Sequence, residues 1–111
     1  MIDLASDKFY HYVIVRDDLP IGHLAAQTIH AAGESAALTA PPQGTHAIAL
    51  QAAPDALKDI SIALAMADIR HVTIREPDFP YCNAITALGI APQPRSKALS
   101  KIVGELRLVG S

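Results

Sequence analysis

The amino-acid sequence predicts an α/β domain in which helices cover a small mixed β-sheet. Short β-branched segments alternate with longer alanine-rich segments along the chain, which is typical of strands alternating with helices. Half of the 111 residues are hydrophobic, yet 20 residues are alanine and only five are Phe or Tyr. Small apolar side chains let helices approach a sheet closely, which suits a compact layered domain.

Strands and helices are expected in the order β-α-β-α-β-β-α. The first strand is a β-branched and aromatic run, and the hydrophobic period changes to that of a helix after Pro20 and Gly22. Pro54 and Asp55 suit the start of the second helix, and Gly104 suits the end of the third. The expected strands are 10–15, 46–51, 71–75 and 84–90, with a short strand or tail at 106–109, and the expected helices are 21–37, 54–67 and 95–103.

The first expected helix has two distinct sides. Polar residues lie within a stripe about 60° wide, and this stripe consists of His23, Gln27, His30 and Glu34. The opposite side, which we expect to lie against the sheet, consists of Ala25, Ile29, Ala32 and Ala36. The stripe is either a solvated face or a functional one. Two histidines without any Lys or Arg would make a poor solvated face, which favours the functional alternative. His23 and His30 are about 10.5 Å apart along the helix axis, too far to share a metal ion.

A second polar cluster, Arg75-Glu76-Pro77-Asp78, follows the third expected strand. Loops after strands often hold functional groups because the sheet positions them, although a polar turn would have the same composition. Thr86 on the next strand could orient a water, or it could simply be a good strand former. The sequence contains no nucleophile elbow, phosphate-binding loop or dinucleotide-binding glycine motif.

The formal net charge is −2 and the isoelectric point is about 6.2, so no overall charge attracts nucleic acid or acidic lipid. The charge is uneven: residues 1–68 hold three basic and eight acidic side chains, whereas residues 69–111 hold six basic and three acidic ones. The basic part is either ordinary surface or an anion-binding patch. A single cysteine, Cys82, and the lack of a signal peptide or a long apolar run predict a soluble cytoplasmic protein with no membrane segment.

Residues 12–32, YVIVRDDLPIGHLAAQTIHAA, resemble the peptidyl-tRNA hydrolase type II family, with the chain as a divergent member. That family has an apolar strand, then Asp-Leu, a glycine and a helix that opens with Ala-Ala-Gln-x-x-His-Ala. The order and spacing of the later segments extend the resemblance over about residues 9–109. His23 stands where the family usually has a lysine implicated in activity, and Glu76 is followed by Pro77 rather than by Ala-Gly.

The resemblance implies a three-layer α/β/α fold with a mixed four-stranded sheet. We expect a tail over residues 1–8 and a single domain over residues 9–111. The implied activity is hydrolysis of the ester bond of peptidyl-tRNA, or of a related aminoacyl ester, without a metal or organic cofactor. A homodimer is plausible by analogy. The alternative is a non-catalytic or repurposed family member that binds a nucleotide-like ligand or a protein partner, which the net acidity and the missing lysine favour.

The implied site contains a base, a carboxylate and two polar residues that position groups. The His23 imidazole and one carboxylate, either Glu76 or Asp78, would position and deprotonate a water for attack on the ester. Gln27 would hold the water or a substrate carbonyl. Thr86 would orient the carboxylate or the water.

Two further sets of residues are expected to support catalysis and tRNA binding. Asp18 and His30 belong to the same motif and are candidate supporting residues. Contacts with the phosphates of the tRNA 3′ end would give salt-dependent affinity rather than sequence choice. The basic residues expected to make them are Arg75, Arg95, Lys97 and Lys101.

Overall fold

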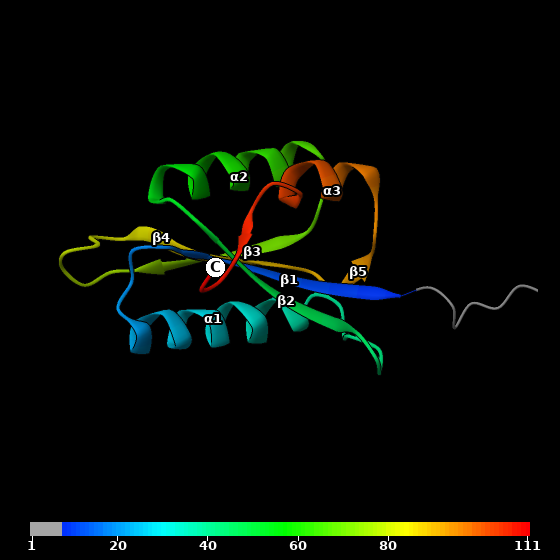
Figure 1. Cartoon of the computed structure of the whole chain (residues 1–111), viewed down its shortest axis with the longest axis horizontal. Coiled ribbons are helices and arrows are strands. Elements are labelled where there is room, and N and C mark those ends of the chain that lie inside the picture. Colours follow the sequence, from blue (N-terminus) through cyan, green and yellow to red (C-terminus); the bar gives the residue numbers. More distant parts are fainter. Residues whose placement is uncertain (1–7) are drawn as a thin grey trace, which may run out of the picture.

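Residues 8–111, which the computed structural model describes, form three helices and a six-stranded sheet (Figure 1). The expected tail, residues 1–8, lies outside the described residues except for Lys8. Every expected helix and long strand is present, with ends within two residues of the prediction. The elements are β1 Phe9–Arg16, α1 Ile21–Ala36, β2 His46–Ala52, α2 Pro54–Met66, β3 His71–Glu76, β4 Ala84–Ile90, β5 Gln93–Pro94, α3 Lys97–Val103 and β6 Arg107–Leu108.

The sheet is mixed, and its strand order is β3-β4-β1-β2-β6, with β5 pairing with β1. β1 and β2 are parallel, and β4 is antiparallel to both β1 and β3. β1, β2 and β3 therefore point the same way. The four strands that the resemblance implies are corrected to six in the described part of the chain, because two strands of two residues each are added: β6, which lies within the short strand or tail expected at 106–109, and β5, which was not expected. The sequence did not predict β5 because proline lacks the N–H that a strand donates to its neighbour, so a segment that contains proline does not resemble a strand.

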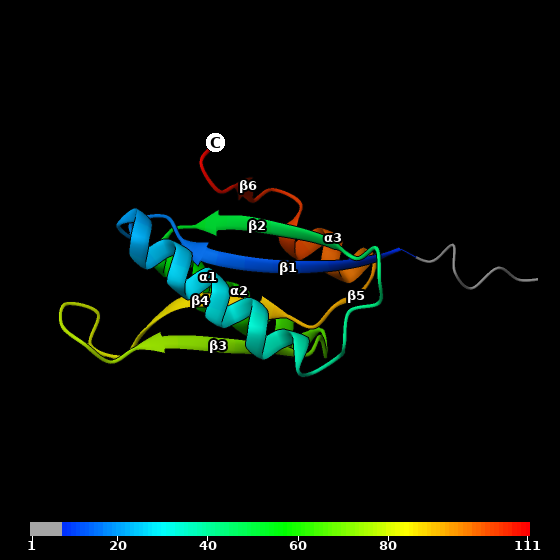
Figure 2. The same ribbon diagram turned by 90° about the horizontal axis from the view of Figure 1, so that it is seen from below.

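The three-layer α/β/α architecture is confirmed, since α1 covers one face of the sheet and α2 and α3 cover the other (Figures 1 and 2). Side chains alternate along the central strand β1 and so contribute to two separate cores. Val13 and Val15 pack with Ala31 on the α1 side. Ile14 packs with Leu57 and other apolar residues of α2 and α3 on the opposite side.

Helix α1 turns a different side to the sheet from the one predicted. Its buried residues are Gln27, Ala31 and Ser35, whereas Ala25 is exposed and Ile29 is 71% exposed. The observed buried side lies about a third of a turn from the predicted one. Polar residues can face the sheet here because the Gln27 amide nitrogen and the Ser35 hydroxyl both find hydrogen-bond partners, which offsets part of the cost of burying them.

A close backbone contact between α1 and β4 accompanies this orientation. A Cβ atom at Gly89 would lie 2.3 Å from the Ala31 carbonyl oxygen and 2.7 Å from Ser35 Oγ. The Ser35 hydroxyl donates to that same Ala31 carbonyl at 2.6 Å, and it lies 2.7 Å from His11 Nε2. Burial lowers the pKa of His11. The helix can approach β4 this closely because position 89 has no side chain.

Replacing Gly89 with alanine tests this packing. Gly89→Ala should lower the free energy of unfolding by about 2–3 kcal/mol, because the Ala31 carbonyl can move only if the helix moves. Gly33→Ala is the matched control: a Cβ atom at Gly33 would meet nothing within 4 Å, and a helical Gly→Ala change should raise stability by about 0.5–1 kcal/mol. Chemical denaturation measures both variants. A Gly89→Ala protein as stable as the wild type would contradict the close contact.

Candidate functional site

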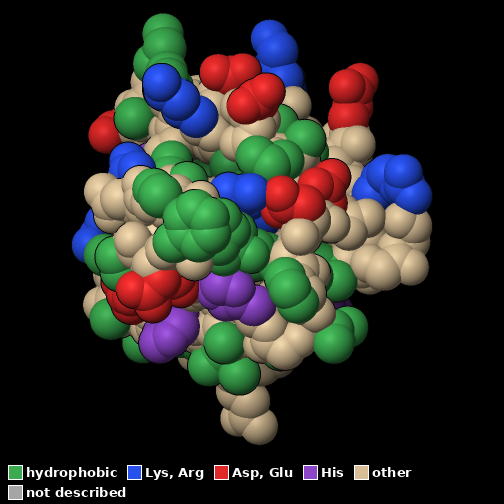
Figure 3. Space-filling model, turned by 90° about the vertical axis from the view of Figure 1, so that its left-hand side faces the viewer, with side chains coloured by type: hydrophobic (Ala, Val, Ile, Leu, Met, Phe, Trp, Pro, Cys, Tyr) green, Lys and Arg blue, Asp and Glu red, His purple; other side chains and the backbone are tan. Residues whose placement is uncertain are grey.

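β1, β2 and β3 all end at one edge of the sheet (Figure 2), and part of the candidate set, His23, Gln27 and Glu76, lies there. Ligands of open α/β sheets commonly bind outside the carboxyl ends of parallel strands. α1 begins shortly after β1, and the loop of residues 77–83 follows β3. Figure 3 looks onto this edge and shows acidic, basic and histidine side chains interspersed on it.

His23, Gln27 and Glu76 form one cluster of side chains. Glu76 Oε2 lies 3.1 Å from His23 Nε2 and 3.2 Å from Gln27 Nε2, and the two nitrogens are 3.2 Å apart. His23 and Gln27 are four residues apart on α1, so they lie on the same side of the helix. Glu76 is 53 positions from His23 and ends β3. The His23 and Glu76 side chains are 27% and 18% exposed, so solvent reaches both.

The hydrogen bonds define which atom carries each proton. The backbone N–H of Asp78, which donates to Glu76 Oε1 at 3.2 Å, and the His23 side chain lower the pKa of Glu76. An ionised carboxylate only accepts hydrogen bonds, so His23 Nε2 and Gln27 Nε2 both donate to Oε2. In the neutral imidazole, Nδ1 is then unprotonated and able to accept a proton.

Arg16 and Tyr81 complete the surroundings of His23, and the sequence-based prediction included neither. The Tyr81 ring contacts the imidazole edge-on, with centroids 5.1 Å apart. The Arg16 guanidinium lies 5.1 Å from the Tyr81 ring centroid, and it donates two hydrogen bonds of 2.8 and 2.7 Å to Asp18. Asp18 therefore reaches the site through Arg16 and Tyr81. Arg16 could have been identified from the charged run at the end of β1, whereas no sequence motif indicates Tyr81.

The other candidate residues lie outside this cluster. Asp78 is exposed, and its backbone N–H donates to Glu76 Oε1. Thr86 is fully buried, and its hydroxyl donates to the Ile74 carbonyl at 3.4 Å rather than to Glu76. His30 is exposed on α1. Of the two carboxylates left open by the sequence, Glu76 is the one whose side chain contacts His23.

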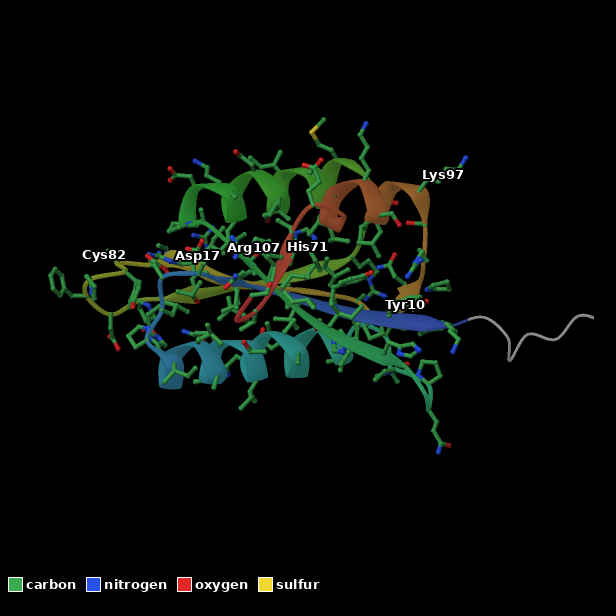
Figure 4. The ribbon with its side chains drawn as sticks, viewed as in Figure 1. Tyr10, Asp17, His71, Cys82, Lys97 and Arg107 are labelled. Atoms are coloured by element: carbon green, nitrogen blue, oxygen red, sulfur yellow. The ribbon has the colours of Figure 1, made fainter. Side chains whose placement is uncertain are left out.

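The four basic candidates do not form a single patch. Arg75 lies near the end of β3, and it donates to the Asn83 carbonyl at 3.0 Å. The Arg95 guanidinium lies 4.8 Å from the Tyr10 ring centroid, near the beginning of β1. Lys97 and Lys101 are both exposed on α3. Figure 4 shows Lys97 and Tyr10 at the opposite end of the molecule from Cys82, whose loop borders the site.

Comparison with known proteins relates this site to a family. The family model for the peptidyl-tRNA hydrolase PTH2 matches residues 9–109. The chain belongs to the PTH2 family. This confirms the resemblance seen in the sequence. No curated protein matches the chain.

Solved structures confirm the fold of this PTH2-family chain. A protein of unknown function from Agrobacterium tumefaciens strain C58 superposes with a TM-score of 0.74 at 17% identity, over 90% of this chain and 96% of that one. Within residues 8–111, no helix is long and apolar enough to cross a membrane. In the same range, no group of three or more His, Cys, Asp or Glu residues is arranged to hold a metal ion.

Removing the Glu76 carboxylate should flatten the dependence of stability on acid pH. The folded-state pKa of Glu76 lies below its ordinary 4.5, so the unfolded chain binds more protons than the folded one as pH falls past that value. The stability that Glu76 contributes is present above pH 4.5 and is lost as pH falls through the lower folded pKa.

Denaturation at several pH values should therefore show a smaller loss below pH 4.5 for Glu76→Gln than for the wild type. Glu34→Gln, which removes an exposed carboxylate from α1, is the control and should follow the wild type. Superimposable profiles for Glu76→Gln and the wild type would contradict the hydrogen bonding described for Glu76.

Proposed function

We propose that this chain hydrolyses the ester that joins a peptide to the 3′ end of tRNA, or a related aminoacyl ester, with a water activated by His23. Membership of the PTH2 family supports peptidyl-tRNA as the substrate. The observation that carries the proposal is the 3.1 Å contact between His23 and Glu76, which pairs an imidazole with an ionised carboxylate at a solvent-accessible edge. Such a protein would meet its substrate in the cytoplasm.

The proposed reaction moves one proton through the His23 imidazole. Glu76 accepts the Nε2–H bond and so orients the ring, and Nδ1 removes a proton from water as the water oxygen attacks the ester carbonyl carbon. When the tetrahedral intermediate collapses, the ester bond to the ribose oxygen breaks and that oxygen takes the proton from Nδ1. The carboxylate stabilises the imidazolium between the two steps. These steps need no metal or organic cofactor.

Gln27 is proposed to position the attacking water. Its amide nitrogen donates to Glu76, so its carbonyl oxygen is the atom that remains for another contact. That oxygen is buried and has no hydrogen-bond partner among the described residues. An unsatisfied buried acceptor costs about 1–3 kcal/mol, so a water that donates to it is bound favourably. Thr86 would act indirectly, because its hydroxyl holds the backbone of the strand that ends in Glu76.

Substitution of the two central residues tests the mechanism. His23→Ala should lower kcat for an N-blocked aminoacyl-tRNA by about 10²–10⁴-fold, the usual contribution of a general base. Glu76→Gln should lower kcat less, by about 10–100-fold, because the imidazole remains but loses its orienting charge. Release of the blocked amino acid, with and without a chelator, measures both.

His46→Ala is the control, since His46 is exposed at the start of β2, away from the site. A loss of about twofold or less for both His23→Ala and Glu76→Gln would show that neither residue carries the chemistry. That result would favour the alternative function, in which the chain binds a nucleotide-like ligand or a protein partner.

We also propose that the chain forms a homodimer through the outer side of α1. Ile21 and Ile29 are 84% and 71% exposed, and exposed Ala25 lies between them at four-residue spacing. α1 contains no Lys or Arg, so a second copy could cover this line of apolar side chains without burying a positive charge.

Sedimentation velocity tests the dimer. Ile29→Glu should convert a dimer to a monomer, because an unpaired carboxylate is costly to bury. Ile62→Glu, which changes a half-exposed isoleucine of α2, should leave the oligomeric state unchanged. A monomeric wild type, or a dimer that survives Ile29→Glu, would exclude this interface.

A further inference from the structure

We propose that a groove on the α2 side of the carboxyl edge binds the single-stranded nucleotides that precede the ester at the tRNA 3′ end. The inference rests on the proposed function, because it gives the substrate of the His23 site a place to bind. The groove has a volume of about 570 Å³. Its walls come from the end of β1, the first turns of α2, the end of β3 and the start of β4.

Strand alternation places the groove and His23 on two sides of the same edge. Ile74 belongs to the core under α1, and Ile14 belongs to the core under α2. Successive side chains of a strand point to opposite faces, so Arg75 and Arg16 both point to the α2 side. Both line the groove.

Arg16 links the groove to the reaction centre. Arg16 lines the groove, its guanidinium lies over the Tyr81 ring, and that ring contacts the His23 imidazole. A chain of nucleotides that leaves the groove past Arg16 therefore arrives beside the imidazole. The Arg16–Asp18 ion pair, with two hydrogen bonds, holds the guanidinium at this crossing point.

The charges of the groove suit a nucleotide. Lys58 and Arg75 line it, and neither forms an ion pair with another described residue, so both can bind phosphate oxygens. Asp55 and Asp59 also line it, and carboxylates accept hydrogen bonds from ribose hydroxyl groups and base amino groups. Ile85 adds apolar surface for the face of a base. The two carboxylates would repel a simple anion, whereas a nucleotide has hydroxyl and amino groups that can donate hydrogen bonds to them.

The size of the groove favours unpaired nucleotides over a duplex. Pockets for small ligands measure about 300–1,000 Å³, so this groove can hold one or two nucleotides. Sequence-selective proteins usually bind RNA through unstacked single-stranded bases, whose edges become available for hydrogen bonds. The segment that joins the tRNA helix to the ester is of this kind.

Kinetics with three substrates distinguish binding in the groove from chemistry at the reaction centre. The substrates are an N-acetylaminoacyl ester of adenosine, the same ester on a cytidine-cytidine-adenosine trinucleotide, and N-acetylaminoacyl-tRNA. Lys58→Gln and Arg75→Gln should each raise KM about five- to tenfold for the two substrates that contain phosphates, because each removes a charged contact. Neither variant should change kcat or the KM for the adenosine ester. The salt dependence of trinucleotide binding should also decrease, by about one unit of log–log slope per cation removed.

Lys8→Gln and Arg70→Gln are the matched controls, because they remove the same charges from the opposite ends of β1 and β3. Both should leave the KM for the trinucleotide ester unchanged. Thermal unfolding checks that all four variants fold. Equal effects in the controls, unchanged KM in the groove variants, or an equal rise in KM for the adenosine ester would overturn the proposal.

Fluorescence anisotropy with a labelled, deacylated trinucleotide tests the groove without catalysis. Weaker binding by Lys58→Gln and Arg75→Gln than by the wild type would support the groove even if the wild type hydrolysed none of the esters, a result that would refute the proposed function alone. Wild-type hydrolysis combined with equal trinucleotide binding by all variants would refute the groove alone.

Discussion

The packing of the α1 backbone on Gly89 of β4 is the constraint on which the position of the imidazole depends. His23, Gln27, Ala31 and Ser35 follow one another at four-residue spacing and so form one line along α1. Ala31 and Ser35 pack against Gly89. His23, on the same side of the helix, lies beside Glu76. A helix rotated by one residue position, about 100°, would carry the imidazole away from the carboxylate. The contact of Ala31 and Ser35 with Gly89 and the contact of His23 with Glu76 therefore both depend on the same rotation of α1 about its axis.

The elements of the fold follow from the sequence, but the side of α1 that is buried does not. Pro54 begins α2 as its position predicts, and the β-branched run at the start of the domain becomes the central strand. α1 has few large apolar side chains on any side, so periodicity alone could not select the buried one. The deciding contact, between Ala31 and Gly89, joins segments far apart in the chain.

The site is partly predictable for similar reasons. His23, Gln27 and Glu76 stand out by motif and by position after strands, and strand alternation explains why the Glu76 side chain faces α1 while Arg75 faces α2. Tyr81 reaches His23 because the loop of residues 77–83 folds back, with the Tyr81 backbone N–H donating to the Asp78 carbonyl. No pattern in the sequence encodes that loop conformation, so neither Tyr81 nor its contact with Arg16 could be anticipated.

The hydrogen bonds that converge on Glu76 have a consequence for the barrier of the proposed reaction. Both carboxylate oxygens already accept hydrogen bonds from the protein, one from the Asp78 backbone and the other from His23 and Gln27. In the proposed reaction the imidazole gains a positive charge, and these hydrogen bonds already hold the carboxylate facing it. Dipoles fixed before the reaction lower the reorganisation energy that the same charges would require in water. For the proposed imidazolium, the folded chain already holds this carboxylate in place, so less of that reorganisation would remain for the reaction itself.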